Sequence, residues 1–528
     1  MSIPAFQYLL SFPLMTKRLF QVLLLGIALA AVAMVVVATK HGVGLSNDST
    51  GYIAGARQLA HGKGLVMPNG SVITHFPPLF AGLLALPGAV GIDAMIVARV
   101  LNLLLLGAIV MLAAAIVSAC SGGSRAAGLL AAGLMATSVD LLTVHAYAWS
   151  EPLFILNAVA GLWLLQRYLW SPRRWLLVSG SVLTAAAFLT RYAGAAAVLT
   201  GAAGLLFVPG RPLRRRMSDI FVLLAITLIP MLVWFTRNYL AADSATNRRA
   251  VYHPITLDQL TIGARTFTNW FIDVRSPVVA ATFSSLFTVG LIVLIAISFT
   301  RTRVQIMQPA SPARMPLLFG LFVPIYASFL VISLCWFDAQ IPLDQRMLTP
   351  MLVMSICFLM PGVGTLAAKG RSAKMLWITF TSLMILMGWF LYRDYRWINQ
   401  SRRWGLGYAS PSWRRSPVMA AVRALPHDVF IYTNAPGAVL MLADHAVADL
   451  PQKFDRNTKV SKDDYRARMN LMRQRMSVYR GYIVYFSAAG SRHNLPTLTE
   501  LKLEMPLEEE MHCSDAAIYR WGGPVTQP

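Results

Sequence analysis

Residues 19–39 read LFQVLLLGIALAAVAMVVVAT, a stretch without a charged side chain. An α-helix needs about twenty consecutive, predominantly apolar residues to cross the hydrocarbon core of a bilayer. Ten further windows of this kind follow, so the sequence predicts a polytopic α-helical membrane protein with about eleven transmembrane helices. The windows lie at approximately 19–39, 94–118, 126–142, 151–168, 175–190, 193–208, 218–236, 279–300, 316–336, 347–366 and 375–392.

The composition of the chain excludes an ordinary soluble enzyme. Of its 528 residues, 56% are hydrophobic and 13% are charged, and the mean hydropathy is +0.57, whereas about a quarter of the residues in a typical soluble domain are charged. The formal net charge of +23 would suggest a nucleic-acid ligand in a polar chain. Here the arginines and lysines flank the apolar windows, so we expect no nucleic-acid partner. The four cysteines are too widely spaced to indicate a disulfide framework or a zinc site.

The basic residues between the windows predict the orientation of the bundle, because arginine and lysine are enriched in short cytoplasmic loops. Alternate loops hold them, at Lys17, Arg18, Arg125, Arg167, Arg173, Arg174, Arg211, Arg214, Arg215, Arg216, Arg301, Arg303, Arg314, Lys369, Arg371 and Lys374. We therefore predict a cytoplasmic N-terminus. The external side then consists of segments 40–93, 143–150, 237–278, 337–346 and the tail from about 393. Lys17 and Arg18 also resemble the start of a secretory signal, but no small-residue cleavage site follows, so we expect the first window to remain.

Acidic residues have the opposite distribution. The first 392 residues contain ten of them, and only Asp219 falls on the predicted cytoplasmic side. The other nine are Asp48, Asp93, Asp140, Glu151, Asp243, Asp258, Asp273, Asp338 and Asp344. The high free energy of a carboxylate in hydrocarbon explains why these residues avoid the windows. It does not explain why they favour one aqueous side, so we favour an external acidic site.

Two domains are predicted. Residues 1–392 form the membrane domain, with a long first external loop at 40–93, and residues 393–528 form a soluble extracytoplasmic α/β domain. This tail carries 19 Lys+Arg and 13 Asp+Glu. Strands are expected at 429–433, 482–486 and 516–521, and helices at 438–443 and about 462–479. The sequence has no P-loop and no GxGxxG motif in a strand-to-helix setting, which argues against a nucleotide-driven pump.

The first external loop contains three distinctive runs, LSNDSTGY at 45–52, ARQLAHGKG at 56–64 and HFPPLF at 75–80. Asp48 or Ser49 can cap a short surface helix that runs through Ala60. Backbone N–H groups at the start of that helix would keep the Asp48 carboxylate ionised and fixed in position. Capping alone explains this aspartate equally well. His75 is suited either to contact a phosphate or to make a structural hydrogen bond.

Further polar residues lie where the windows meet the external side. Asp140 precedes the run HAYAWSEPLF at 145–154, in which Glu151 either helps to cap a helix or binds a hydroxyl group or a metal ion. Three arginines stand at external window ends, Arg191, Arg237 and Arg346. A guanidinium there suits a phosphate or pyrophosphate at the membrane surface. Snorkelling of the side chain to the interface is the alternative.

In their order and spacing, these motifs resemble the glycosyltransferase C superfamily over roughly residues 20–450. Within it, they are similar to the bacterial branch of protein O-mannosyltransferases and the aminoarabinose transferase of lipid A. The matching pieces are Asn47-Asp48 with Tyr52, Phe76-Pro77-Pro78-Leu79, Ser150-Glu151-Pro152-Leu153-Phe154, Leu189-Thr190-Arg191-Tyr192, Asp344-Gln345-Arg346-Met347-Leu348-Thr349-Pro350 and Ile431-Tyr432-Thr433-Asn434-Ala435-Pro436. The lipid A branch has a lysine immediately before the double proline, where this chain has Phe76, which argues against a lipid A acceptor.

The resemblance implies an integral membrane glycosyltransferase that moves a sugar from a polyprenyl-phosphate donor to an extracytoplasmic hydroxyl of a glycan, lipid or protein. It implies that Asp48 acts on the acceptor hydroxyl, and we expect this residue to be the general base of a single inverting displacement. The expected phosphate contacts are Arg191, Arg346, Arg237 and His75. The expected sugar or acceptor contacts are Glu151, Tyr52 and Asp140. No cofactor is predicted with certainty, and a divalent metal ion near Glu151 is left open.

The resemblance also implies a multi-pass protein of the inner (plasma) membrane with a periplasmic or extracellular C-terminal domain. A secondary transporter is the alternative function, since it too needs buried charges and about a dozen spans. Transporters usually have paired halves with interrupted helices at matching positions, and this sequence has no such halves. In a third interpretation, the chain is a non-enzymatic assembly protein whose external carboxylates only cap helices. The sequence does not name the sugar or the acceptor.

Overall fold

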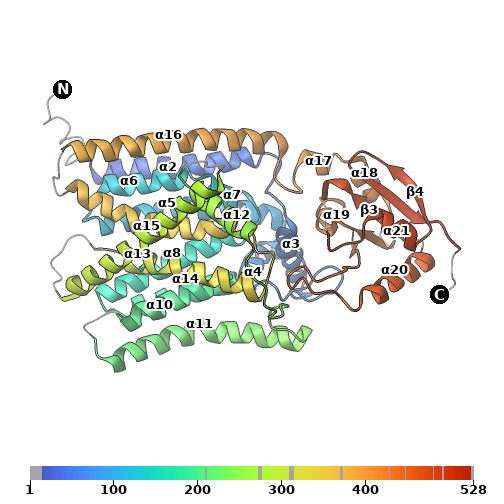
Figure 1. The fold of residues 1–528 in the computed structure, drawn as a ribbon, viewed down its shortest axis with the longest axis horizontal. Coiled ribbons are helices and arrows are strands. Elements are labelled where there is room, and N and C mark those ends of the chain that lie inside the picture. Colours follow the sequence, from blue (N-terminus) through green and yellow to red (C-terminus); the bar gives the residue numbers. More distant parts are fainter. Residues whose placement is uncertain are drawn as a thin grey trace.

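The computed structural model describes residues 15–207, 211–271, 276–307, 314–368, 373–426, 429–445, 447–479, 481–489 and 493–524. These residues form a long helical bundle with a small α/β domain at one end (Figure 1). Three residues of the charge pattern, Asp273, Lys369 and Arg371, lie outside the described residues, as do the side chains of Arg301, Arg303 and Lys374.

Each predicted apolar window falls on helical structure. The bundle helices are α2 (Lys17–Ala38), α5 (Ala94–Cys120), α6 (Arg125–Ala136), α7 (Val139–Ala146), α8 (Glu151–Trp170), α9 (Arg174–Thr190), α10 (Ala195–Phe207), α11 (Leu213–Ala242), α13 (Pro277–Met307), α14 (Leu317–Trp336), α15 (Gln345–Ala368) and α16 (Ala373–Trp404). Within the described residues, seven helices are long and apolar enough to cross a membrane: α2, α5, α8, α11, α13, α14 and α15. The chain is a multi-pass membrane protein.

One predicted window is not a single straight helix. The window at 126–142 is divided into α6 and α7, whose axes are bent by 57° at the break. Thr137 and Ser138 lie at the interruption, as the C-cap of α6 and the N-cap of α7. Thr137 donates to the carbonyl of Gly133, and Ser138 accepts from the N–H of Leu141 to cap α7. Two other predicted spans, α9 and α10, are short, at 17 and 13 residues.

Glycines let α8 and α9 approach each other closely. A Cβ atom on Gly161 of α8 would lie 2.8 Å from the Thr184 hydroxyl and 3.2 Å from the Gly180 carbonyl oxygen of α9. In a bilayer, helices associate through such small residues because lipid supplies no hydrophobic force between them. This close packing fixes the start of α8 and the end of α9, which carry Glu151 and Arg191.

The five segments predicted to lie outside meet at one end of the bundle, beside the α/β domain (Figure 1). The contacts that join them are Gly44 N to Ala146 O at 2.8 Å, Arg237 to Ile73 O at 3.1 Å, Arg248 to Asp338 at 3.0 Å and Ala339 N to Asn457 O at 2.8 Å. The start of α11, where Arg211 lies 3.2 Å from Asp219, is at the opposite end of the bundle (Figure 1). The shared end is thus established, and its assignment to the outer face of the membrane stays a prediction.

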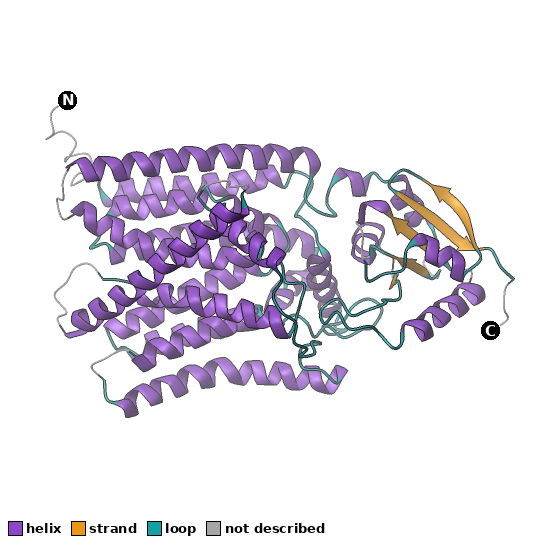
Figure 2. Cartoon of the chain, viewed as in Figure 1, coloured by secondary structure: helices purple, strands orange, loops and turns teal. Residues whose placement is uncertain are grey.

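The α/β domain contains a five-stranded mixed sheet in the order β2-β1-β3-β5-β4 (Figure 2). Its strands are β1 (Ile431–Thr433), β2 (Ala448–Asp449), β3 (Tyr482–Phe486), β4 (Leu507–His512) and β5 (Ala516–Trp521). Its helices are α17 (Pro411–Arg414), α18 (Pro417–Ala424), α19 (Pro436–Ala443), α20 (Tyr465–Tyr479) and α21 (Leu498–Glu504). The three expected strands and two expected helices are present with small shifts at their ends. Strands β2 and β4 were not predicted, because one has two residues and the other reads LEEEMH, without apolar alternation.

The α/β domain is docked on the first external loop through α3 (Asn47–Ala60). Bundle helix α16 continues past residue 392, where we expected the tail to begin, and ends at Trp404. The Tyr408 hydroxyl then donates to Asn47 Oδ1 at 2.6 Å, and the Tyr408 N–H donates to the Leu45 carbonyl at 2.9 Å. At Gly437, a Cβ atom would lie 2.8 Å from the Thr50 hydroxyl, so α19 can approach α3 this closely only with glycine there.

Candidate functional site

Helix α3 begins at the place predicted, but with a different cap. Ser46 is the N-cap, and its hydroxyl accepts the N–H of Ser49 at 3.4 Å. Neither Asp48 nor Ser49, which we expected to cap, has that role. The Asp48 carboxylate therefore stands in the first helical turn, where the helix dipole favours negative charge, and its oxygens are left for other partners.

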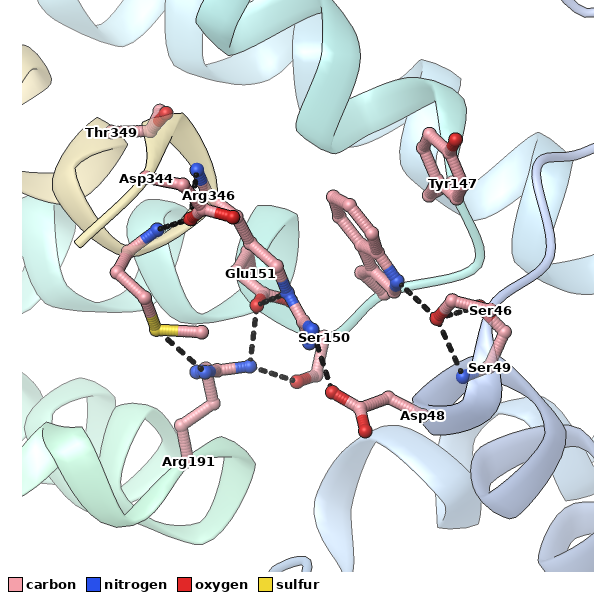
Figure 3. Close-up of polar contacts among 12 residues, drawn as sticks. Ser46, Asp48, Ser49, Tyr147, Ser150, Glu151, Arg191, Asp344, Arg346 and Thr349 are labelled. Carbon is pink, nitrogen blue, oxygen red and sulfur yellow. Dashed lines mark hydrogen bonds and ion pairs between the residues drawn. The ribbon is translucent and has the colours of Figure 1, made fainter. Parts of the chain in front are cut away.

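Four charged side chains converge beside α3, and we call them the charged cluster: Asp48, Glu151, Arg191 and Arg346 (Figure 3). Arg346 Nη1 lies 2.6 Å from Asp48 Oδ2, and Arg346 Nε donates to Glu151 Oε1. Arg191 Nη1 lies 2.7 Å from the same Glu151 oxygen. The start of α3, the start of α8, the end of α9 and the start of α15 thus meet through one connected ion-pair network.

Local structure at each helix end aims these side chains. Asp344 Oδ1 accepts the N–H groups of Arg346 and Met347 at 3.0 and 3.2 Å, which caps the first turn of α15 and directs Arg346 inward. Arg191 is the C-cap of α9 and has extended backbone, so the chain turns there before α10. The Arg191 side chain, paired with Glu151, is 16% exposed, so it faces a protein partner.

Aromatic and hydroxyl groups contact the charged cluster and hold its side chains in position. The Arg346 guanidinium lies 4.3 Å from the ring centroid of Trp149, and Trp149 Nε1 donates to the Ser46 hydroxyl at 2.8 Å. Ser150 is the N-cap residue of α8 but makes no capping bond with its side chain. Its hydroxyl instead lies 2.8 Å from the Tyr52 hydroxyl and 3.2 Å from Arg191 Nη1. These contacts restrict the rotamers of both arginines.

The two carboxylates of the charged cluster, Glu151 and Asp48, differ in their exposure to solvent. The Glu151 side chain is 2% exposed, whereas that of Asp48 is 37% exposed. Burial acts to raise the pKa of Asp48, but Arg346, with smaller contributions from Arg191 and His75, holds this pKa below its usual value of 3.8. Burial lowers the pKa of the nearby His75 below 6.5, although the Asp48 carboxylate opposes this effect. Asp48 is therefore ionised, and His75 neutral, at pH 7.

Two buried atoms of the charged cluster have no hydrogen-bond partner in the described part of the chain. They are the donor Arg346 Nη2 and the acceptor Glu151 Oε2. An unmade hydrogen bond at a buried polar group costs roughly 1–3 kcal/mol. The pair thus offers one guanidinium donor to an anion and one carboxylate oxygen to a hydroxyl. Among the described residues, no three His, Cys, Asp or Glu side chains are grouped so as to hold a metal ion.

A second feature, which we call the α3 cleft, lies between the first external loop and the α/β domain. Its volume is about 350 Å³, and its lining includes Asn47, Asn69, His75, Gln452, Arg456 and Asn494. This volume is within the range of small-molecule sites, roughly 300–1,000 Å³. The cleft and the charged cluster therefore share α3 and His75 as a common wall.

Known proteins resemble this chain in structure and not in sequence. No protein-family model and no curated protein matches the sequence. ArnT from Cupriavidus metallidurans bound to undecaprenyl phosphate is similar over 97% of this chain and 100% of ArnT, with a TM-score of 0.59 and 12% identity. The apo state of the same protein gives a TM-score of 0.60 over 94% of this chain and 97% of ArnT, again at 12% identity. The apo oligosaccharyltransferase of Archaeoglobus fulgidus gives 0.51, with 12% identity, over 90% of this chain and 70% of that protein.

The chain has the fold of ArnT, which the archaeal oligosaccharyltransferase shares in part. This confirms the predicted fold class, a polytopic helical membrane domain followed by a small α/β domain. At 12% identity, the likeness concerns the fold alone, so the roles of residues rest on the geometry of this chain.

Within this fold, the predicted site residues separate into two groups. Asp48, Glu151, Arg191 and Arg346 form the charged cluster, with Tyr52 and His75 directly beside it. Tyr52 is 1% exposed and stacks on Phe76 at 4.3 Å, and burial raises its pKa well above the usual 10. Its hydroxyl therefore stays protonated.

Two predicted residues are not brought to the charged cluster. Arg237 donates to the carbonyls of Ile73 and Leu65 at 3.1 and 3.2 Å, so it holds the first external loop in place. Asp140 is 5% exposed and lines a separate small cavity with Trp270 and Arg393. Neither residue has a contact with Asp48 or Glu151 within the described part of the chain.

Sequence reasoning did not identify Ser46 and Trp149 as parts of the site. Both lay inside runs that we had singled out, LSNDSTGY and HAYAWSEPLF. The pairing of Trp149 Nε1 with Ser46 depends on the parallel bridge between Gly44 and Tyr147. Nothing in the order of residues indicates that bridge, which joins positions about a hundred residues apart.

Proposed function

We propose that this protein is a membrane glycosyltransferase that transfers a sugar from a polyprenyl-phosphate donor to an acceptor hydroxyl, with inversion at the anomeric carbon. The observation that carries the proposal is the Asp48–Arg346–Glu151–Arg191 network, because it combines a partly exposed carboxylate with two guanidinium groups at one end of the bundle. Support for the donor class comes from the fold, since a solved ArnT of this fold binds undecaprenyl phosphate.

Asp48 is the general base of the proposed reaction. Only its Oδ2 is paired with Arg346, and among the described residues Oδ1 accepts no hydrogen bond, so one oxygen is available to an acceptor hydroxyl. The acceptor oxygen attacks the anomeric carbon as its proton passes to Asp48. The bond between this carbon and the phosphate oxygen breaks, and its electron pair leaves with the polyprenyl phosphate.

Arg346 and Arg191 stabilise the phosphate as it gains negative charge. The unpartnered Nη2 of Arg346 supplies a donor already fixed in position, so little reorganisation is needed when charge develops. When Arg346 also binds the phosphate, its ion pair with Asp48 becomes weaker. The pKa of Asp48 then rises in the donor complex, which makes the carboxylate a stronger base when it is needed. The free Oε2 of Glu151 is left to accept a sugar hydroxyl.

Consumption of donor by the purified full-length protein tests the proposal. The protein in detergent is mixed with a panel of polyprenyl-phosphate sugars and a hydroxyl acceptor, and release of polyprenyl phosphate is measured. We expect one donor to be consumed and its sugar to appear on the acceptor with inverted configuration. Uptake of a labelled solute into proteoliposomes without lipid donor, together with no consumption of any donor, would instead establish the secondary transporter.

A further inference from the structure

The α3 cleft is next to the proposed base. Asn47 and Gly51 line the cleft and flank Asp48 on the same helix, and His75 lines it as well. A Cβ atom on Gly51 would lie 2.8 Å from the Phe76 ring and 3.9 Å from His75 Nε2, so glycine here lets the 75–76 segment pack against α3. His75 is also close enough to Asp48 for each charge to shift the pKa of the other. A molecule in the cleft therefore has a short path to the carboxylate.

Most of the polar side chains that line the cleft are uncharged. Four side-chain amides line it from separate segments, those of Asn47, Asn69, Gln452 and Asn494. In the described part of the chain, none of their amide nitrogens donates a hydrogen bond, whereas Asn47 Oδ1 and Asn69 Oδ1 accept from Tyr408 and Ser71. The cleft thus offers a surplus of neutral donors.

Charged groups in the cleft are few and balanced. Among the described residues, the charged groups that line it, apart from the neutral His75, are Asp449 and Arg456. Arg456 already donates from Nε to Gln340 Oε1 at 3.2 Å. An anionic acceptor such as a phosphorylated lipid would find one guanidinium among the described lining residues, whereas the proposed phosphate site has two, Arg191 and Arg346. A peptide acceptor would find the sheet edge at β2, which is two residues long.

We propose that the α3 cleft binds the acceptor, and that the acceptor is a neutral polyhydroxylated glycan. The inference rests on the proposed glycosyl transfer and adds to it the substrate class. A side-chain amide can donate from its NH2 group and accept at its oxygen when it pairs with sugar hydroxyls, so four amides match several hydroxyls at once. A glycan bound in the cleft extends past His75 and places one hydroxyl at Asp48 Oδ1. The lipid donor approaches Asp48 from the side of the helical bundle.

Acceptor kinetics with cleft variants test this inference. Ser71 lines the cleft and is exposed, so Ser71→Trp fills the space at its rim, and Asn494→Ala removes one amide without adding bulk. Ser514→Trp is the matched control, because Ser514 is exposed and lies outside the lining, in the turn between β4 and β5. The acceptor probes are maltotriose, mannotriose, glucose 6-phosphate and a serine-threonine peptide.

We expect a neutral trisaccharide to have the lowest acceptor KM. Ser71→Trp should raise this acceptor KM about tenfold or more, and Asn494→Ala should raise it severalfold. Both variants should change the donor KM less than twofold. Ser514→Trp should change neither the acceptor KM nor the donor KM. The inference is overturned if the peptide or the sugar phosphate is the best acceptor, or if both cleft variants leave the acceptor KM unchanged. If donor is consumed only with the peptide or the sugar phosphate, the proposed acceptor class is wrong, but the proposed glycosyl transfer stands. Failure of the wild-type protein to consume any donor overturns the proposed function with it.

Discussion

The two sides of α3 differ in how their polar groups are arranged. In the charged cluster, two carboxylates and two guanidinium groups neutralise one another through contacts of 2.6 and 2.7 Å, and Glu151 is almost fully buried. The described lining of the α3 cleft includes four side-chain amides, and none of their N–H groups has a partner among the described residues. The charged side is preorganised and each of its members depends on the others, whereas the neutral side is a set of independent contacts. Single isosteric changes should therefore disable the first and only weaken the second.

The largest effect should come from Asp48→Asn. The amide keeps the size of the side chain but cannot accept the acceptor proton, so we expect kcat to fall about 10²–10⁴-fold, the usual contribution of a general base. Transfer is measured with purified protein at saturating donor. Asp93→Asn is the matched control, because Asp93 also pairs with an arginine at 2.7 Å and has the same 37% exposure. An Asp48→Asn variant that folds and keeps full transfer activity would remove Asp48 from the mechanism.

Arg346→Lys should have the next largest effect. Lysine keeps the positive charge but cannot contact Asp48, Glu151 and a phosphate from one planar group, so we expect kcat to fall about 10²–10³-fold, as on loss of an oxyanion donor. Arg237→Lys is the comparison, since Arg237 was predicted to bind phosphate but contacts the loop backbone. Its donor KM should stay within about threefold of wild type. Equal losses in the two variants would mean that Arg346 acts through loop structure and not through the phosphate.

The sequence was sufficient for the architecture because the signals involved are local. Apolar windows of about twenty residues predict spans, and their alternation with basic loops predicts which loops share an end. The break at Thr137 and Ser138 was missed because both residues sit within an apolar run and act through side-chain bonds to neighbouring backbone. Strand β4 was missed because LEEEMH owes its place to pairing with β5 and not to its own pattern.

For the site, the sequence predicted residue types better than it predicted partners. Asp48, Glu151, Arg191 and Arg346 were all selected as charges at external helix ends, and they do meet. Arg237 and Asp140 satisfied the same rule, yet they face other partners. Position along the membrane normal can be inferred from hydropathy, whereas position around the bundle depends on helix packing, which has no comparable local signal.

Glu151→Gln should act mainly on stability and donor binding. It leaves two guanidinium groups near one carboxylate, so we expect a loss of about 3 kcal/mol in unfolding free energy, as for a broken buried ion pair. The donor KM should rise about tenfold, because Arg191 and Arg346 lose the anion that orients them. Thermal unfolding in detergent and donor kinetics measure these effects. Asp219→Asn breaks the Arg211 pair at the other end of the bundle, and it should lower stability while leaving the donor KM unchanged.

The smallest effect should be a difference in pH between the acid limb of the kcat profile and that of the kcat/KM profile. Arg346 holds the pKa of free Asp48 below 3.8, so Asp48 remains ionised above about pH 4 and should not limit kcat/KM between pH 5 and 8. A donor phosphate that shares Arg346 raises this pKa, so the acid limb of kcat, which reports the complex, should lie at higher pH than that of kcat/KM.

The His75→Gln variant distinguishes titration of His75 from titration of the proposed base, Asp48. The pKa of His75 lies below 6.5, so His75 gains a proton, and a positive charge next to Asp48, only as the pH falls below that value. His75→Gln should remove any acid limb of kcat/KM that arises from this charge. An acid limb near pH 6–7 that persists in His75→Gln would show that the base has a raised pKa in the free protein. The base would then be a carboxylate outside the Arg346 pair, and the distinction between the two sides of α3 would no longer separate catalysis from acceptor binding.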